Sequence, residues 1–427
     1  MEKVTQIRMR SLEDVELAGR TVIFRPDINS PIDPKTKRIV NTNRLEKAAP
    51  TLKTLLDGGA KVALLAHQGD TLDYQNLIPL AEHAQILSKL TGYEITYLDD
   101  VCGLTAIQTV RSLKEGQAVI LGNLRYLSEE ITAFEKEVKL KPSEMLGTWL
   151  VRSLAPLADL YVNDAFAAAH RNAPSMVAFQ ELLPTAGGKQ LVAEYTALSK
   201  VASQPIHPCV FVLGGGKISD AFGMMRNVLE NKTADTILCG GITALVMLLA
   251  KGVSLGDSTW NFLKDRDLLQ FVDQAKQLLA SWPEAFVIPL DLAYEEEGKR
   301  KETTIETIAG SKALQSKLFL DLGEQTIESY KLVIAKAGSI FVNGPAGVYE
   351  DERFEKATKE IWTAIADADG YTVVGGGDTI TAATRFTDLK QYSYVCTAGG
   401  AMVRFLSGKK LPLIEAMEKA WKRDCKE

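Results

Sequence analysis

The sequence predicts an α/β protein built from two doubly wound parallel-sheet domains. Short β-rich runs alternate with stretches of helical period along the chain, which is the pattern of βα units in parallel sheets. The chain has 427 residues, enough for two or three domains at roughly 150 residues each. Its composition, 46% hydrophobic and 24% charged, is that of an ordinary globular protein.

The first block of strands and helices occupies residues 1–190. The β-rich residues 21–24 predict its first strand. Asn43 is expected to cap a helix with a leucine-rich face, and Gly58 and Gly59 are expected to end it. Further strands are predicted over residues 62–66, 118–121 and 159–162.

The second block begins after Pro208. Residues 191–203 have helical character and are followed by Gln204 and Pro205, so we expect a linker helix over 191–205 and a second domain over 206–410. Strands are predicted in that domain over residues 210–213, 236–239, 286–289, 339–342 and 372–374. Doubly wound domains bind ligands at the carboxyl ends of their strands, so functional residues are expected there.

Charge, cysteine content and hydropathy exclude several classes of protein. The formal net charge of −5 excludes a broadly basic nucleic-acid binder. Five scattered cysteines without a CxxC pair fit a reducing cytosol and indicate neither a zinc site nor a disulfide framework. The longest apolar stretch, residues 236–250, is shorter than the ~20 residues that span a bilayer, and the N-terminus lacks the apolar segment of a signal peptide. We therefore expect a cytoplasmic protein that binds neither membrane nor nucleic acid.

Glycine turns follow strands repeatedly in the second block. They are Gly214–Gly216 followed by Lys217, the pair Gly240-Gly241, Gly375–Gly377 followed by Asp378 and Thr379, and Gly399-Gly400 after residues 394–396. A glycine turn before a helix lets a phosphate approach backbone N–H groups at the positive end of the helix dipole. A single such turn also occurs as a plain βα connection. Their number in one domain favours nucleotide phosphates, although no P-loop or dinucleotide fingerprint is present.

Polar and basic side chains follow the strands of the first block instead. They are Arg25, Asp27 and Asn29 after the first strand, Arg44 at the next helix start, His67 and Arg125 after two later strands, and Arg171 after Asn163-Asp164. Each arginine by itself is also compatible with a solvated or salt-bridged side chain. Together, at the face where α/β ligands bind, they predict an anion pocket.

An anion-binding domain joined to a nucleotide-phosphate domain suggests a kinase with a hinge, and the residues resemble the phosphoglycerate kinase family. The similar stretches occur in the family's order and cover nearly the whole chain: RPDINSP (25–31), NRL (43–45), AHQG (66–69), NLRY (123–126), NDAFAAAHR (163–171), GGGK (214–217), NGPAGVYE (343–350), GGGDT (375–379) and the region 399–416. DINSP and AFAAAHR are closer to the archaeal-type branch.

The resemblance implies two doubly wound domains joined by a hinge helix around a central cleft, with residues 411–427 packing back on the first domain. It implies transfer of a phosphoryl group between ATP and the carboxylate of 3-phosphoglycerate, with Mg²⁺ as cofactor. A carboxylate is already a nucleophile at neutral pH, so the reaction needs positioning and charge neutralisation rather than a catalytic base. The partners expected are these small molecules, and monomer and homodimer both remain open.

The resemblance also implies roles for individual residues. The phosphoglycerate ligands would be Arg25, Asp27, Asn29, Arg44, His67, Arg125 and Arg171. The nucleotide ligands would be Gly215, Lys217, Gly240, Asn343, Pro345, Glu350, Gly376, Gly377, Asp378 and Thr379. Asp378 would hold the metal, and the catalytic groups would be Arg44, Lys217, Gly376 and Gly399.

Three positions depart from the family pattern. Asp70 stands where the family has arginine, Ala221 where many members have a second lysine, and Ala398 where the family has glycine. An anion near a bound phosphate is worth ~4 kcal/mol at about 4 Å and an effective dielectric of 20. If Asp70 turns to solvent, the change is peripheral and the cost is much smaller. If it faces the ligand, it indicates a different carboxylic acid substrate or a homologue with weakened catalysis that binds nucleotide.

Overall fold

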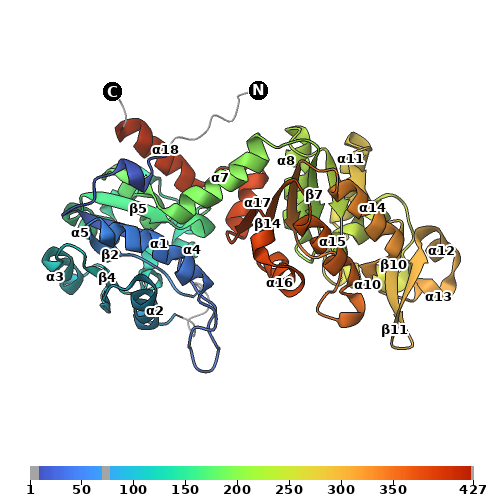
Figure 1. Cartoon of the computed structure of the whole chain (residues 1–427), viewed down its shortest axis with the longest axis horizontal. Helices are drawn as coiled ribbons and strands as arrows, with labels where there is room; N and C mark the ends of the chain where they lie inside the picture. Colours follow the sequence, from blue (N-terminus) through green and yellow to red (C-terminus); the bar gives the residue numbers. More distant parts are fainter. Residues whose placement is uncertain (1–8, 70–76, 425–427) are drawn as a thin grey trace. The chain divides into compact units, whose positions relative to one another are not determined.

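The chain folds into two compact units in the computed structural model, which describes residues 9–69 and 77–424 (Figure 1). Unit 1 contains residues Met1–Thr196 and Lys410–Glu427, and unit 2 contains Ala197–Lys409. The helical stretch between the two sequence blocks is α7 (Lys189–Ser203), and the division falls within it. None of the described helices is both long and apolar enough to cross a membrane.

Unit 1 contains a six-stranded parallel sheet in the order β3-β4-β2-β1-β5-β6. Its strands are β1 (Thr21–Pro26), β2 (Lys61–Leu64), β3 (Ile95–Tyr97), β4 (Ala118–Ile120), β5 (Leu160–Asp164) and β6 (Thr185–Gly187). Every residue of β1 is buried, as expected for a central strand with helices on both faces. The short edge strands β3 and β6 are absent from the strands predicted from the sequence.

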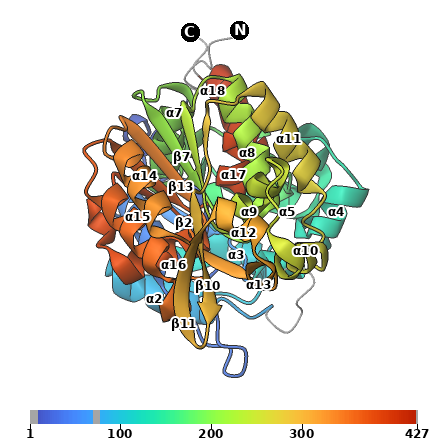
Figure 2. The same ribbon diagram turned by 90° about the vertical axis from the view of Figure 1, so that its right-hand side faces the viewer.

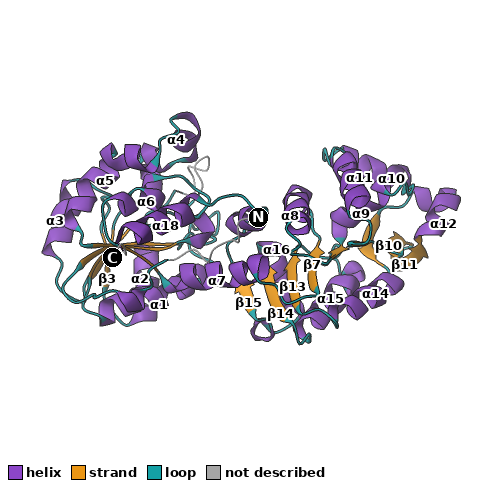
Figure 3. Ribbon diagram, turned by 90° about the horizontal axis from the view of Figure 1, so that it is seen from above, coloured by secondary structure: helices purple, strands orange, loops and turns teal. Residues whose placement is uncertain are grey.

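The helices of unit 1 cover both faces of this sheet. They are α1 (Asn43–Asp57), α2 (Ala81–Thr91), α3 (Leu104–Ser112), α4 (Thr132–Glu137), α5 (Trp149–Leu154) and α6 (Pro174–Val177). Figure 3 shows α1 and α2 on one face and α5 and α6 on the other. The prediction that Asn43 caps α1 is wrong by one residue, because the N-cap is Thr42, whose carbonyl accepts a hydrogen bond from the Glu46 N–H at 2.9 Å.

The last helix, α18 (Pro412–Asp424), belongs to unit 1 although it follows the whole of unit 2 in the sequence (Figure 1). Its buried face includes Leu413, Ile414 and Met417. The Arg423 guanidinium donates to the main-chain carbonyls of Gln180 and Leu183, at 2.5 and 2.7 Å. The end of the chain is therefore attached to unit 1 by both apolar packing and hydrogen bonds.

Unit 2 contains a second six-stranded parallel sheet, in the order β15-β14-β13-β7-β8-β9. Its strands are β7 (Cys209–Leu213), β8 (Thr236–Cys239), β9 (Phe286–Val287), β13 (Ser339–Asn343), β14 (Tyr371–Gly375) and β15 (Tyr394–Cys396). Each strand predicted in the second block is present. The strand predicted over 286–289 ends two residues early.

The helices of unit 2 are α8 (Ile218–Glu230), α9 (Gly241–Ala250), α10 (Gly256–Lys264), α11 (Phe271–Ser281), α12 (Ile305–Gly310), α13 (Lys312–Gln315), α14 (Glu324–Ile334), α15 (Lys356–Ala366), α16 (Gly377–Phe386) and α17 (Gly400–Leu406). Figures 2 and 3 show α8 and α11 on one face of the sheet and α14 and α15 on the other. Helices on both faces explain the nearly continuous burial of β7, β13 and β14.

A small antiparallel sheet, absent from the sequence prediction, completes unit 2. It has the order β11-β10-β12 and consists of β10 (Asp291–Glu296), β11 (Lys299–Thr304) and β12 (Phe319–Leu322). A two-residue turn at Glu297 and Gly298, both with positive φ, joins β10 to β11. Strand β11 has the sequence KRKETT and no buried residue, so it lacks the apolar alternation by which strands are recognised.

The strand order of each large sheet reverses at one point. In unit 1, β1 pairs with β2 on one side and β5 on the other. In unit 2, β7 pairs with β8 on one side and β13 on the other. Open α/β sheets bind ligands beyond the carboxyl ends of the strands at such a reversal. Ligand-binding groups are therefore expected among the residues at and after the carboxyl ends of β1 and β5, and of β7 and β13.

Candidate functional site

A polar cavity of about 90 Å³ lies beyond the carboxyl ends of β7, β13 and β14 in unit 2. Glycine turns after these strands and after β15 form much of its wall. The lining residues are Gly214, Gly215, Gly216, Lys217, Asp220, Asn343, Gly344, Gly376, Gly377, Asp378, Thr379, Gly399, Gly400 and Val403. Seven of the predicted nucleotide ligands line this cavity together with Gly399, a predicted catalytic residue. We call this cavity the glycine cradle.

Three glycines of the cradle, Gly214, Gly344 and Gly376, have no room for a side chain. Gly376 has φ +97°, and a Cβ there would lie 2.5 Å from Asn343 Nδ2. A Cβ on Gly214 would lie 2.2 Å from the carbonyl oxygen of Pro345. Both approaches are shorter than any real carbon contact, so only glycine allows these turns to pack against the loop after β13.

Hydrogen bonds hold the loop after β13 against the start of α16. Asn343 Nδ2 donates to the Gly375 carbonyl at 2.7 Å, and the Gly344 N–H donates to Thr379 Oγ1 at 2.7 Å. Helix α16 begins at Gly377, directly at the cradle, and is ten residues long. Its first-turn N–H groups and positive dipole end therefore face a cavity that fits an anion.

The charged side chains of the cradle are Lys217, Asp220 and Asp378. Lys217 and Asp378 are exposed, so both are accessible to a ligand. Burial raises the pKa of Asp220, while the charges of Lys217 and Lys409 act in the opposite direction. The cradle therefore offers one ammonium group for a phosphate and a carboxylate oxygen of the kind that Mg²⁺ prefers.

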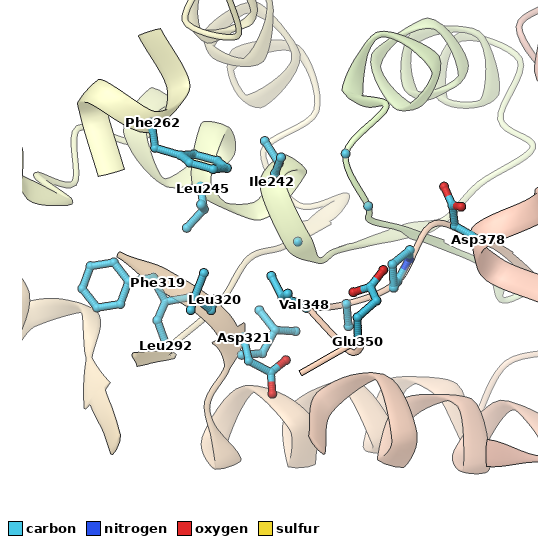
Figure 4. Close-up of a pocket in the computed structure, with 17 residues that line it drawn as sticks. Ile242, Leu245, Phe262, Leu292, Phe319, Leu320, Asp321, Val348, Glu350 and Asp378 are labelled. Atoms are coloured by element: carbon cyan, nitrogen blue, oxygen red, sulfur yellow. The ribbon is translucent and has the colours of Figure 1, made fainter. Parts of the chain in front are cut away.

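A second, larger cavity of about 240 Å³ shares Gly215, Gly216 and Asp378 with the cradle. Most of its lining is apolar and comes from α9, α10, β10, β12 and the loop after β13: Ile242, Leu245, Phe262, Leu292, Phe319, Leu320, Leu322, Pro345, Ala346 and Val348. Figure 4 shows Phe262, Leu245 and Ile242 opposite Leu292, Phe319 and Leu320, with Glu350 toward Asp378. The pocket is suited to a flat group that is largely apolar, with a polar substituent toward Glu350 and the cradle.

Most of the apolar pocket was not predicted from the sequence. Gly240, a predicted nucleotide ligand, lines neither cavity, whereas its neighbour Gly241 lines the larger one. A Cβ on Gly240 would lie 2.9 Å from Ala346 Cα, so this glycine serves close packing. The carboxylate of Asp321 points away from the apolar side chains (Figure 4) and accepts a hydrogen bond from the Ala357 N–H at 3.2 Å. Isolated apolar residues from separate elements carry no motif that could have identified them.

The predicted basic cluster of unit 1 forms around a buried pair, Arg25 near the carboxyl end of β1 and His67 after β2. Arg25 Nη2 donates to His67 Nδ1 at 3.0 Å, and the two side chains are almost wholly inaccessible. Because a guanidinium only donates, His67 Nδ1 must accept, and the proton of the neutral ring lies on Nε2. Burial, followed by the charges of Arg25, Arg125, Arg171 and Arg44, lowers the pKa of His67 well below its usual value.

Each of the other predicted basic residues has a fixed partner. Arg44 forms an ion pair with Asp27, and Arg171 forms one with Glu135 at 2.7 Å. Arg125 Nη1 donates to the Glu130 carbonyl at 2.7 Å. Together with His67 and Arg25, these residues form a preorganised cationic site, which we call the arginine cluster.

The loop that carries Asp27 and Asn29 is tied to the turn after β2. Asn29 Oδ1 accepts a hydrogen bond from the Gly69 N–H at 3.0 Å, and Gln68 Nε2 donates to the Ser30 carbonyl at 2.8 Å. All the phosphoglycerate ligands predicted from the sequence are therefore brought together in unit 1. Gln68, which helps to hold them, lies in the AHQG stretch, whereas Glu130, Glu135 and Ser175 carry no signal that distinguishes them in the sequence.

The departures from the family pattern have different outcomes. Asp70 lies outside the described residues. Ala398 does not adopt a positive φ, so alanine causes no backbone strain there. Ala221 is buried on α8 and lines neither cavity, which leaves Lys217 as the lysine that lines the cradle.

Comparisons with known proteins agree on one family. The family model described as phosphoglycerate kinase matches residues 12–409. The phosphoglycerate kinase of Thermococcus onnurineus is 40% identical over 419 residues, which is 97% of this chain and 98% of that protein. The enzyme of Methanothermus fervidus is 36% identical over 416 residues, again 97% of this chain and 98% of that one.

Solved structures of phosphoglycerate kinases are similar over almost the full chain. The crystal structure from Pyrococcus horikoshii OT3 has a TM-score of 0.85 and 34% identity, and the match covers 97% of this chain and all of that one. The structure from Coxiella burnetii has a TM-score of 0.80 and 29% identity, covering 96% and 99%.

Proposed function

The chain belongs to the phosphoglycerate kinase family, and on this premise we propose that it transfers a phosphoryl group reversibly between ATP and the carboxylate of 3-phosphoglycerate. The observation that carries the proposal is the glycine cradle, continuous with an apolar pocket, at the strand-order reversal of unit 2. A base in the apolar pocket and phosphates in the cradle account for both cavities. The arginine cluster of unit 1 supplies the matching site for an anionic acid.

On the nucleotide side, the N-terminus of α16 and the main-chain N–H groups of the glycine turns would hold the phosphates. Lys217 would contact the phosphoryl group during transfer, and Glu350 would contact the sugar end of the nucleoside. These donors are in place before the reaction, so they stabilise developing charge without reorganisation.

The carboxylate of Asp378 lines both cavities and is exposed, and a hard carboxylate oxygen beside the phosphate cradle fits Mg²⁺. We propose that Asp378 holds the ion together with the nucleotide phosphates. The ion would supply neutralisation of the phosphate charge.

On the acid side, Arg25, Arg44, Arg125 and Arg171 would bind the phosphate and carboxylate of 3-phosphoglycerate, with Asp27, Asn29 and His67 ordering them. Because His67 is neutral, it can donate from Nε2 without adding charge. The substrate carboxylate attacks the phosphorus directly, so no base is required. Since the two sets of ligands lie in different units, transfer would need the units to bring the two bound substrates together, which would also exclude water.

The experiment that tests the proposal is a coupled assay of the purified chain with ATP, Mg²⁺ and 3-phosphoglycerate. We expect turnover at a rate ordinary for a kinase, about 1–100 s⁻¹. A second candidate, a related enzyme for a different carboxylic acid, is favoured by Asp70 alone. Poor turnover of 3-phosphoglycerate with intact ADP binding would support that candidate, and loss of turnover with every acid tested would support a nucleotide-binding homologue.

A further inference from the structure

A buried carboxylate, Glu130, lies behind the arginine cluster and is only 3% exposed. It ends a short 3-10 helix, Ser128–Glu130. Its two carboxylate oxygens are both engaged by one residue, since the Ser175 N–H donates to Oε1 at 2.6 Å and Ser175 Oγ donates to Oε2 at 2.7 Å. Ser175 is wholly buried, so these bonds are shielded from water.

The carboxylate reaches Arg25 through the same serine. Ser175 Oγ gives its only proton to Glu130, so a lone pair of this oxygen faces Arg25 Nε, which donates to it at 3.2 Å. Arg25 then donates from Nη2 to His67. A chain of hydrogen bonds therefore runs from Glu130 through Ser175 and Arg25 to the imidazole ring.

The main-chain carbonyl of Glu130 holds two more members of the cluster. It accepts from Arg125 Nη1 at 2.7 Å and from Arg171 Nη2 at 3.2 Å. One residue thus contacts three arginines, two through its backbone and one through a serine.

We propose that Glu130 is a positioning residue that fixes Arg25, and with it His67, in the geometry that binds the acid substrate. This inference rests on the proposed function, because it assigns a role within the acid site. Glu130 acts through Ser175, and its negative charge also balances a buried guanidinium that would otherwise be costly to desolvate. Burial raises the pKa of Glu130, while the Ser175 hydrogen bonds and the charge of Arg25 favour its ionised form.

If the role of Glu130 were purely structural, its substitution would have a different effect. Glu130 accepts the Ser175 N–H at the start of α6, so it also contributes to local stability. A structural role alone would lower the melting temperature and leave the folded fraction of the protein with normal kinetic constants. A positioning role changes the KM for the acid in protein that is fully folded.

The test is Glu130→Gln, which keeps the shape of the side chain and removes its charge. We expect the KM for 3-phosphoglycerate to rise tenfold or more, with the KM for ATP unchanged within twofold and kcat within threefold. The matched control is Glu144→Gln, an exposed carboxylate of the same unit that accepts the Lys141 N–H. All its constants should equal those of the wild type.

Ser175→Ala provides the second arm, and it carries the test if Glu130→Gln does not fold. It should raise the same KM, and the double variant should be no worse than the more affected single variant, because both changes cut one chain of contacts. Wild-type KM for 3-phosphoglycerate in the folded variants, or equal loss of both KM values and kcat, would overturn the inference while the proposed function stands. A wild type that neither binds 3-phosphoglycerate in calorimetry nor phosphorylates it would overturn both.

Discussion

The two units present candidate anion sites of opposite construction. In unit 2, the glycine cradle is formed by main-chain turns and the start of α16, with few charged side chains. In unit 1, the arginine cluster is formed by guanidinium groups, each held by a carboxylate, a carbonyl or a histidine. Both lie at the same place in the topology, the carboxyl ends of strands at the reversal of strand order.

The two sites are therefore sensitive to different kinds of substitution. A cradle made of backbone fails when a side chain is added, because the N–H groups lose their approach to the phosphate. A cluster made of side chains fails when its partners are removed, because a buried charge or donor is left uncompensated. Steric changes should therefore damage unit 2, and changes of charge or hydrogen bonding should damage unit 1.

Lys217 is a charged side chain in a site otherwise made mostly of backbone, and its removal should give the largest effect. Lys217→Ala is expected to lower kcat by roughly 10²–10³-fold while the Kd for ADP changes much less, because the ammonium meets charge that develops during transfer. Steady-state kinetics and ADP titration measure the two quantities. Equal losses in kcat and ADP affinity would make Lys217 a ground-state ligand.

The next largest effect is on the free energy of unfolding and concerns a buried hydrogen bond of unit 1. His83 Nε2 donates to Gln68 Oε1 at 3.0 Å, and burial lowers the pKa of His83 from 6.5 to about 4. His83 therefore becomes protonated near pH 6.5 in the unfolded chain but only near pH 4 in the folded chain. Between these values the unfolded chain binds more protons, so the free energy of unfolding falls as pH falls. By pH 5 the loss is about 2 kcal/mol, roughly thirtyfold in the unfolding equilibrium.

Urea unfolding of the wild type and His83→Gln at pH 7 and pH 5 measures this effect. The variant lacks the titrating group, so its free energy of unfolding should fall less between the two pH values, whatever its stability at pH 7. Parallel pH dependence of the two proteins would show that His83 is not responsible. Comparison of the two proteins cancels the contribution of all other titrating groups.

A smaller effect tests the backbone site of unit 2. Gly376→Ala places a Cβ 2.5 Å from Asn343 Nδ2 at φ +97°, so the turn before α16 must move. We expect the KM for ATP to rise about tenfold, as ~1.4 kcal/mol of phosphate binding is lost, with the KM for the acid nearly unchanged. Gly310→Ala, with nothing within 4 Å of its added Cβ, is the control in the same unit. A normal KM for ATP in Gly376→Ala would refute the close fit.

The last prediction concerns the charge at position 70, where the expected change in the KM for 3-phosphoglycerate is between about tenfold and none. If Asp70 borders the phosphate of 3-phosphoglycerate, Asp70→Arg should lower the KM for this acid roughly tenfold, and the gain should shrink at high salt. A wild type that is efficient with 3-phosphoglycerate and indifferent to Asp70→Arg would show that this side chain faces away from the ligand. A substitution that harms the use of another acid would instead support the altered specificity.

Parts of both sites could be predicted because they depend on residues close in sequence. A β-rich run followed by glycines, such as residues 209–216, predicts a strand, a turn and an anion site together. Arg25, near the carboxyl end of β1, and Arg125, after β4, were identified for the same reason. Gly240 shows the limit of this reasoning, because the same pattern of strand and glycine also occurs where a glycine packs closely against Ala346 and lines neither cavity.

The class of the fold, most of the strands in both large sheets and the types of residue at their ends could be predicted from local sequence patterns. The alternation of apolar runs with glycine turns is a local pattern, so it can be recognised without knowing which distant residues are in contact. The tertiary structure decided the antiparallel sheet at β10–β12, the apolar pocket around Phe262 and Phe319, and the place of Glu130 behind three arginines. These features join residues far apart in the chain, and their contacts exist only after the sheets have formed.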